Sequence, residues 1–550
     1  MITGSWRAAA AVLADAGVRV LFGLPGDDLD ALAAVADAGI RFVLCRDQRN
    51  AVFMATGYAL QSGRLGVALV GKGPAVTNAV TGMLEASSSA APVLLLSAGT
   101  AVERRGGGAF QELDQLSVVA PLTRWAARVD HPDRLVPMLR RGLAVAAHQH
   151  GPVYLELPDH LLGAEIPVPA GGTVETPCAL TLAPDSPATA ALRAARRPIL
   201  LVGGGMRHRN ADRLVETVAE SLGAAVFCTA TGRGAVDESL PLFCGLSGLY
   251  TPPAAARLWA ETDCVLALGS RLEETATFQW PAGLPVIQVN VNIADVNTDF
   301  AGPAVLADAR AVLARWRDCR PADRDWVATV HSVHDELRAE RDAALGAARA
   351  APGLRVAEVL AALDEVVPAD RIMVQENGLQ DMWSYRYPLH VCAAGAGSVV
   401  PSEQTSLGFG AAAAVGVRLA APDRPVVAFV GDGAFGLFGA DLPTAVAAGG
   451  LLYVVLRNGG YGWLQAQLDQ RAAPPAGYAF VDPAAVTARA PDLPGLRQVT
   501  ATKGTLTTDI AEAWKLAEAG QVSVLNVPVG LADAWFGGDA AGGDFPVAQP

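Results

Sequence analysis

Two polar side chains each follow an apolar run in the last third of the chain, and together they could bind a hard cation. The run PVVAFV is followed by the triplet GDG, centred on Asp432, and LLYVVL is followed closely by Asn458 and two glycines. If these runs are successive parallel strands, both residues lie at the carboxyl edge of one sheet, where open α/β sheets bind ligands. A carboxylate, a side-chain amide and the Gly460 carbonyl are oxygen ligands that suit Mg²⁺, which leaves part of its shell for phosphate.

The spacing of these two residues decides between a site and an ordinary turn. A lone GDG most often marks a turn, and a lone asparagine can simply end a strand. Asp432 and Asn458 are 26 residues apart, the length of one helical crossover. That spacing favours a metal and phosphate site, and the glycines beside Asp432 would let the backbone approach a phosphate closely.

The elements that must position these residues form a regular alternation. Short apolar runs rich in Val, Leu and Ile alternate with Ala-rich segments of helix length, which predicts parallel strands covered on both faces. The alternation is broken at 166–186, which is dense in Pro, Gly and Thr, and at about 318–352, which has no strand candidate. We therefore predict an α/β chain of three doubly wound parallel-sheet domains over 1–168, 187–318 and 353–535.

Composition excludes several classes of protein. The 550 residues include 42 basic and 55 acidic side chains, and a net charge of -13 opposes broad contact with nucleic acid. The seven cysteines form no CxxC pair, so neither a zinc site nor a disulfide framework is predicted. No apolar run reaches the ~20 residues that cross a bilayer, and the first run is too short for a secretory signal. We expect a cytoplasmic protein without nucleic-acid or membrane partners.

The order of motifs resembles the thiamine-diphosphate (ThDP) enzymes of the acetohydroxyacid synthase and 2-oxoacid decarboxylase superfamily. GDG, the following asparagine and GGYG are similar to the motif that binds diphosphate and magnesium in that family. The other matching segments are FGLPG (22–26), ATGYA (55–59), GPAVTN (73–78), AFQE (109–112), LLVGGGM in the central unit, NGLQDMW (377–383) and SLGFG (406–410). The resemblance covers nearly the whole chain.

The resemblance implies ThDP and Mg²⁺ as cofactors and gives each matched residue a role. Asp432, Asn458 and the Gly460 carbonyl would hold the ion. The residues implied to bind the cofactor's diphosphate are Gly378, Gln380, Gly431, Gly433 and Ala434. Leu407 would lie beneath the thiazolium ring and keep the cofactor bent, whereas without the resemblance it would be taken for a core leucine.

FAD is a third cofactor to consider. Synthases of this family bind it in the central domain, where a strand of this chain is followed by the glycines 203–205. These glycines alone are a weak nucleotide signal, because MRHRN follows them and not GxxG.

Gln48 is the sharpest departure from the family. Nine residues before Gly57, the family carries a glutamate that hydrogen-bonds N1′ of the aminopyrimidine and promotes removal of the C2 proton. A neutral amide cannot supply a proton there, although its NH₂ group can still donate to N1′. Asp47 is not a substitute, because adjacent helical residues point ~100° apart and the ATGYA match fixes the register. Activity can survive this loss, since glyoxylate carboligase of the same family also lacks the glutamate.

The residues at the positions where this family contacts its substrate favour formation of a carbon–carbon bond. The pyruvate decarboxylase branch uses a His-His pair and an acid to protonate its product. Here all eight histidines lie outside the matched motifs, and Leu464 occupies the acid's position. We expect a carboligase that decarboxylates a 2-oxo acid such as pyruvate and transfers the acyl unit to a carbonyl acceptor. The alternatives are a simple 2-oxo acid decarboxylase and a ThDP-binding protein that has lost catalysis.

Other positions argue against a housekeeping acetolactate synthase. Gln467 stands where those synthases usually have tryptophan, and Arg457 replaces the first asparagine of the usual pair.

Four more residues are pocket candidates by position. Phe110 and Gln111 lie in AFQE, Asp27 follows FGLPG, and Lys72 precedes Gly73. Lys72 could offer a cation to a substrate carboxylate, but it and Asp27 could equally be solvated loop charges. The resemblance also implies a homodimer or homotetramer. In that family the pyrimidine end of the cofactor lies on the first domain of one chain and the diphosphate on the third domain of its neighbour.

Overall fold

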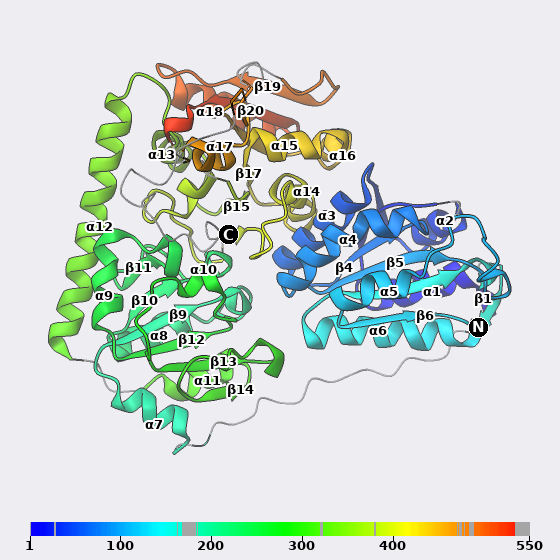
Figure 1. Cartoon of the computed structure of the whole chain (residues 1–550), viewed down its shortest axis with the longest axis horizontal. Coiled ribbons are helices and arrows are strands. Elements are labelled where there is room, and N and C mark those ends of the chain that lie inside the picture. Colours follow the sequence, from blue (N-terminus) through cyan, green and yellow to red (C-terminus); the bar gives the residue numbers. More distant parts are fainter. Residues whose placement is uncertain are drawn as a thin grey trace.

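The computed structural model describes residues 2–26, 29–161, 163–167, 183, 185–318, 323–378, 381–395, 397–469, 471, 476–477, 479–482 and 489–533. These residues form three parallel six-stranded sheets, one in each successive part of the chain (Figure 1). Each sheet is flanked by helices, which confirms the predicted α/β class. Within the described residues, every helix is too short or too polar to span a bilayer.

The first domain is built on a sheet of strand order β3-β2-β4-β5-β7-β6. Its strands are β2 (Val20–Leu24), β3 (Arg41–Leu44), β4 (Gly66–Val70), β5 (Val93–Gly99), β6 (Trp125–Arg128) and β7 (Val153–Pro158). One face packs on α1 (Ser5–Asp15), α2 (Leu29–Asp37) and α6 (Leu135–Gln149), and the other on α3 (Gln48–Ser62), α4 (Pro74–Ser88) and α5 (Gln115–Val119). A short antiparallel pair, β1 (Ile2–Gly4) and β8 (Glu165–Pro167), lies beside this sheet.

The central domain has the order β11-β10-β9-β12-β13-β14. Its strands are β9 (Pro198–Val202), β10 (Ala225–Cys228), β11 (Phe243–Leu246), β12 (Cys264–Leu268), β13 (Val286–Asn290) and β14 (Ala304–Leu306). The helices are α7 (Pro187–Ala194), α8 (Leu214–Leu222), α9 (Ala256–Glu261), α10 (Glu274–Thr277) and α11 (Ala309–Trp316). The strandless stretch of the sequence contains α12 (Arg324–Ala350), whose apolar residues Trp326, Val330 and Leu337 join the central core.

The third domain has the order β16-β15-β17-β18-β20-β19. Its strands are β15 (Ile372–Gln375), β16 (Ser398–Val399), β17 (Val426–Gly431), β18 (Leu451–Arg457), β19 (Leu496–Thr500) and β20 (Val522–Pro528). The helices are α13 (Val356–Val366), α14 (Phe409–Ala420), α15 (Asp432–Phe438), α16 (Leu442–Ala448), α17 (Gly462–Asp469) and α18 (Leu506–Glu518). The bounds given above for the three domains stay a prediction.

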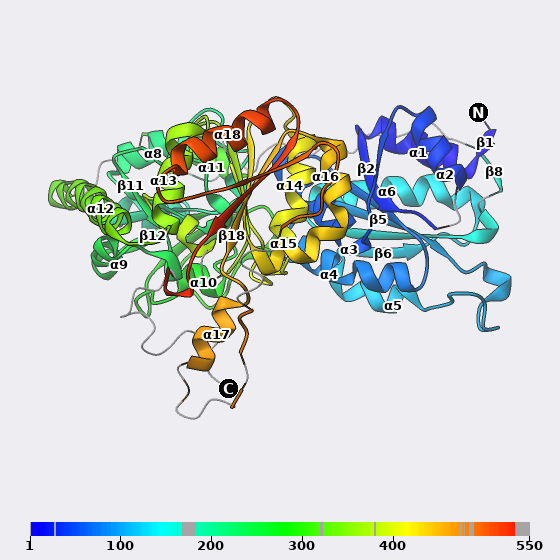
Figure 2. The same cartoon turned by 90° about the horizontal axis from the view of Figure 1, so that it is seen from above.

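Helices α3 and α14 join the first and third domains within one chain (Figures 1 and 2). A Cβ atom on Gly57 would overlap the backbone of Ala413, and one on Gly416 would overlap the carbonyl of Met54. The two helices approach so closely because glycines lie at the contact, and the surrounding apolar residues form one shared core. Gln48 begins α3, and Leu407 lies two residues before α14, so both predicted cofactor residues lie at the ends of these two helices.

Candidate functional site

Asp432 and Asn458 lie at the same edge of the third sheet, as their spacing predicts. β17 and β18 are paired in parallel, so the residues that follow them are neighbours. Asp432 begins α15, and its carboxylate oxygen Oδ2 accepts the Gly459 N–H at 2.8 Å. The side-chain oxygen of Asn458 accepts the Gly460 N–H at 3.0 Å. Covalent order and strand pairing therefore bring these predicted ligands together.

The donor set around Asp432 fits a divalent cation. Asp432, Gly433, Arg457, Gly459 and Gly460 help to line a cavity of about 590 Å³, a size typical of cofactor sites. Burial raises the pKa of the Asp432 carboxyl, and a bound cation would favour its ionised form. One carboxylate with neutral amide and carbonyl oxygens is the kind of set that Mg²⁺ shares with a diphosphate.

Arg457 adds a fixed positive charge to this cavity. It is the last residue of β18 and is buried, and its Nε donates to Asn526 Oδ1 at 2.9 Å. Its guanidinium lies 5.8 Å from the centre of the Phe435 ring, a distance suited to a cation–π contact. A buried guanidinium favours an anionic ligand. Arg457, which replaces the first asparagine of the family's usual pair, therefore adds a candidate anion-binding group to this cavity.

The NGLQ segment is only partly described. Gly378 follows β15, and its carbonyl accepts the Met382 N–H at 3.0 Å, whereas Gln380 lies outside the described residues. The neighbouring Asn377 lines a second cavity, to which all three domains contribute residues. The role predicted for Gly378 and Gln380 at the diphosphate stays a prediction.

Leu407 is not a core leucine. It lies in the loop between β16 and α14 and is 36% exposed. The adjacent Gly408 lies beside α15, the helix that Asp432 begins: a Cβ at Gly408 would be 3.4 Å from the Leu437 Cβ atom and 3.7 Å from the Ala434 carbonyl oxygen. An exposed leucine beside the candidate metal site suits a side chain that contacts a ligand.

Gln48 begins α3 at the carboxyl end of β3. Its Oε1 accepts a hydrogen bond from Asn78 Nδ2 at 2.7 Å, which leaves the NH₂ group as its available donor. Asp47 is the N-cap of α3, and its Oδ1 accepts the N–H groups of Arg49 at 2.8 Å and Asn50 at 3.3 Å. This capping role gives a second reason why Asp47 does not replace the missing glutamate.

Asp441 of the third domain holds the segment around Gln48. Its Oδ1 accepts the Arg46 N–H at 2.7 Å, and its Oδ2 accepts from Asn50 Nδ2 at 2.9 Å. Sequence reasoning missed Asp441, because the bond to Arg46 joins residues 395 positions apart.

A single chain does not bring Gln48 to the Asp432 cavity. All the described residues that line this cavity belong to the third domain, between Asp432 and Pro491. Gln48 and Asp432 therefore do not line one cavity within a single chain, and the composite site implied by the family resemblance stays a prediction.

A buried polar network holds the AFQE segment at the carboxyl edge of the first sheet. Gln115 accepts the Gly73 N–H at 2.6 Å and donates to the Ala98 carbonyl and the Tyr154 hydroxyl, both at 3.0 Å. A Cβ on Gly73 would lie 2.6 Å from the Gln111 carbonyl oxygen, so glycine allows this close approach. Gln115 is a positioning residue that the motif reading missed, although it lies only four residues after Gln111.

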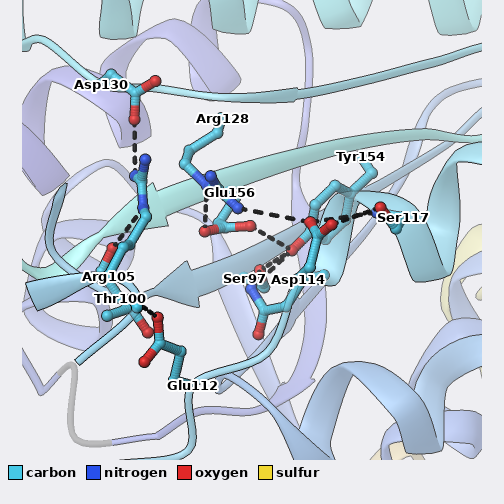
Figure 3. A network of polar contacts seen from close by, with 12 residues as sticks. Ser97, Thr100, Arg105, Glu112, Asp114, Ser117, Arg128, Asp130, Tyr154 and Glu156 are labelled. Carbon is cyan, nitrogen blue, oxygen red and sulfur yellow. Dashed lines mark hydrogen bonds and ion pairs between the residues drawn. The ribbon is translucent and has the colours of Figure 1, made fainter. Parts of the chain in front are cut away.

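The same network extends through the neighbouring strands (Figure 3). The hydroxyl groups of Tyr154 and Ser97 are 2.6 Å apart, and Arg128 Nε donates to Glu156 Oε1 at 2.7 Å. Burial raises the pKa of Tyr154, so it stays a neutral partner at physiological pH. These contacts connect the base of the loop to the sheet, while Phe110 in the loop is 72% exposed.

Comparison with known proteins identifies the family to which this chain belongs. Residues 6–118 match the N-terminal TPP binding domain of thiamine pyrophosphate enzymes, 186–316 the central domain and 376–527 the C-terminal TPP binding domain. The chain is 32% identical to a probable 2-ketoarginine decarboxylase of Pseudomonas aeruginosa, over 80% of this chain and 79% of that protein. The chain belongs to the thiamine-diphosphate enzymes. The resemblance inferred from the motifs is thereby confirmed, as is the prediction that the protein is an enzyme.

Two further relatives of this ThDP enzyme have different activities. It is 30% identical to a sulfoacetaldehyde acetyltransferase of Alcaligenes xylosoxydans xylosoxydans, over 78% of this chain and 77% of that protein. It is 29% identical to the acetolactate synthase isozyme 2 large subunit of Escherichia coli K12, over 76% of each chain. The family is thus fixed, and the particular reaction has to be argued from the site.

The remaining charged candidates of the ThDP enzyme lie at the first domain's sheet edge. Lys72 pairs with Asp159 at 2.5 Å, so its ammonium group already has a carboxylate partner. Asp27 lies outside the described residues. His160 follows Asp159 at the carboxyl end of β7, and its ring nitrogen Nδ1 accepts the Val102 N–H at 3.5 Å. The sequence reading gave His160 no role, because it lies outside every matched motif.

A second cavity of the ThDP enzyme, of about 550 Å³, lies between the carboxyl ends of the central strands and residues of the first and third domains. Arg207 contributes to its wall and donates from Nη2 to the Thr231 carbonyl at 3.0 Å. Its Nη1 is buried and has no partner among the described residues, and burial lowers the pKa of this guanidinium to about 10. A phosphate oxygen would satisfy this donor. The predicted FAD site coincides with this cavity, and FAD itself stays a prediction.

Proposed function

We propose that this ThDP enzyme is a carboligase that decarboxylates a 2-oxo acid such as pyruvate and transfers the acyl unit to an aldehyde or ketone. ThDP, when bound, supplies a nucleophile for the 2-oxo acid and a sink for the electrons left when CO₂ departs. The observation that carries the proposal is the lack of an imidazole at the Asp432 cavity. All eight histidines lie within the described residues, and none lines that cavity.

The residues around the cavity favour transfer of the acyl unit over its protonation. Leu464, which takes the acid's position in α17, is 40% exposed and has no proton to give. Arg457 favours an anionic ligand, such as the diphosphate or the carboxylate of a 2-oxo acid. With protonation slow, a second carbonyl compound can react first. The names of two relatives, acetolactate synthase and sulfoacetaldehyde acetyltransferase, describe transfer of this kind.

A simple decarboxylase is the second candidate, and His160 is the observation in its favour. In a dimer the carboxyl edge of the first sheet would face the partner's Asp432 cavity, so His160 is an imidazole that could protonate the product. The relative named as a 2-ketoarginine decarboxylase is consistent with this outcome.

The two functions are separated by their products. We expect the wild type, supplied with ThDP, Mg²⁺ and a panel of 2-oxo acids, to give mainly condensation products once an aldehyde acceptor is added, as identified by mass spectrometry. His160→Gln should leave that product unchanged, with His131→Gln as a matched control in the same domain.

Other product patterns would contradict the proposal. Aldehyde as the sole product, lost in His160→Gln, would establish the decarboxylase. Absence of any product from every 2-oxo acid, despite ThDP binding, would support lost catalysis.

We further propose that the active enzyme is at least a dimer. Gln48 does not line the Asp432 cavity of its own chain, and the apolar side chains Phe110, Leu407 and Tyr461 are exposed. Light scattering at assay concentration should therefore give twice the chain mass of 56.7 kDa or more. Dilution that produces monomers should abolish turnover, and an active monomer would contradict a composite site.

A further inference from the structure

A buried carboxylate of the first domain holds the loop of the third domain that carries Leu407. Glu85 lies near the end of α4 and is completely buried. Its Oε1 accepts the Ser402 N–H at 2.5 Å, and its Oε2 accepts the Ser406 N–H at 3.3 Å. One side chain thus fixes both ends of the segment 402–406, and Leu407 follows directly.

The segment 402–406 has a conformation that needs such a support. Thr405 has a φ of 45°, in the left-handed region that a β-branched residue rarely adopts. A conformation of this kind is strained and persists only where the surroundings impose it. Within the segment, the Thr405 N–H donates to the Ser402 carbonyl at 2.9 Å. The contacts from Glu85 secure the two ends of this turn.

The carboxylate oxygens of Glu85 accept hydrogen bonds from neutral donors. Ser89 Oγ lies 3.2 Å from its Oε1 and adds a third donor to the two backbone N–H groups. In the described part of the chain, no lysine or arginine forms an ion pair with it. Hydrogen bonds from neutral donors to a carboxylate are roughly twice as strong as neutral pairs, so this carboxylate suits the task of holding a backbone turn.

The position of Ser406 decides where Leu407 lies relative to Asp432. On the other side of Leu407, Gly408 contacts α15, and the Phe409 N–H donates to the Ser406 carbonyl at 3.1 Å as α14 begins. Leu407 is therefore held between the turn fixed by Glu85 and the helices of the third domain. If the turn moves, the exposed leucine moves while Asp432 stays with its strand.

We propose that Glu85 is a positioning residue for the cofactor: by fixing the segment 402–406 it sets the place of Leu407, the side chain that would contact bound ThDP, relative to Asp432. This inference rests on the proposed cofactor roles of Leu407 and Asp432. In a dimer with composite sites, the first domain of each chain would then act on both sites. It would supply Gln48 to one and support Leu407 at the other.

Glu85→Gln tests the proposal with little change of shape. The amide keeps one acceptor oxygen, and its NH₂ group is set against one of the two backbone N–H groups, so one hydrogen bond is lost. Glu216→Gln is the matched control. Glu216 is a buried glutamate of the central domain that accepts from Asn210 Nδ2 at 2.7 Å and from the Asp237 N–H at 3.4 Å, and that also pairs with Arg213 at 3.5 Å.

The first measurement needs no cofactor. In the wild type the amides of Ser402 and Ser406 should be protected from hydrogen exchange although they lie in a loop. In Glu85→Gln they should exchange at least about tenfold faster, and in Glu216→Gln they should not change. Rapid exchange of these amides in the wild type would overturn the proposal even if the Glu85 variant does not fold.

The second measurement separates positioning from general stability. We expect the C2 proton of bound ThDP to exchange for deuterium about tenfold more slowly in Glu85→Gln, per bound cofactor, because a small misplacement has large effects on reactivity. The dissociation constant for ThDP should stay within about threefold, since the metal and diphosphate contacts are intact. A purely structural Glu85 would lower the melting temperature and leave C2 exchange on bound ThDP unchanged. That result would overturn the positioning role alone, whereas a wild type that does not bind ThDP would overturn the cofactor site itself.

Discussion

Asp432→Ala is expected to abolish the thermal stabilisation that ThDP and Mg²⁺ give the wild-type protein. The Asp432 carboxylate is the one charged ligand in the proposed metal set, and the diphosphate is held largely through the ion. At a ligand concentration of about 100 times Kd, binding stabilises the native state by about 2.7 kcal/mol, and the variant should lose all of it. Differential scanning fluorimetry with and without cofactor measures the effect.

Without cofactor, the same substitution should be mild. Burial raises the pKa of Asp432, which means that its ionised form is disfavoured in the native state, and alanine removes that unfavourable term. This gain is offset because the Gly459 N–H loses its hydrogen-bond acceptor. Asp482→Ala is the matched control. Asp482 lines the same cavity, but it is not one of the predicted metal ligands, which follow β17 and β18. Two results would contradict the assignment of Asp432 as a metal ligand. One is a wild-type increase in melting temperature when ThDP and Mg²⁺ are added to Asp432→Ala, and the other is an equal loss of that increase in both variants.

The proximity of Asp432 and Asn458 could be predicted from the sequence because covalent order determines it. Parallel strands joined by one crossover must end at the same edge, so the neighbours of β17 and β18 had to meet. The apolar runs that marked these strands are completely buried, which is why they lacked any alternation of polar residues. Gln48 was assigned differently, by its distance of nine residues from Gly57 in the matched ATGYA segment, and its role at N1′ stays a prediction.

Contacts between distant segments could not be predicted in this way. Glu85 and Ser402 are 317 positions apart, and Lys72 and Asp159 are 87 apart. No periodicity or spacing rule relates such pairs, because they depend on how whole domains pack. The carboxylate partner of Lys72 and the loop support by Glu85 therefore emerge only from the fold.

Gln48→Glu is expected to accelerate exchange of the C2 proton of bound ThDP by about 10²–10⁴-fold, the usual range for a positioned acid or base. The amide of Gln48 can donate to N1′ but cannot exchange a proton with it. A carboxyl group introduced there would keep the contact with Asn78 and lie beside Asp47, whose negative charge raises the pKa of a neighbouring acid. Exchange into deuterium oxide, followed by quenching and NMR of the released cofactor, measures the rate.

Turnover need not rise with this exchange rate, because a carboxylate can disfavour later steps for which the pocket is shaped. Gln149→Glu, an exposed change at the end of α6 in the same domain, controls for the added charge. Equal exchange in the wild type and Gln48→Glu, with ThDP bound to both, would mean that another group activates the cofactor or that Gln48 does not reach N1′. If neither protein exchanges the proton nor consumes a 2-oxo acid, the chain is a ThDP-binding protein without catalysis, because the metal half-site then binds a cofactor that nothing in the first domain activates.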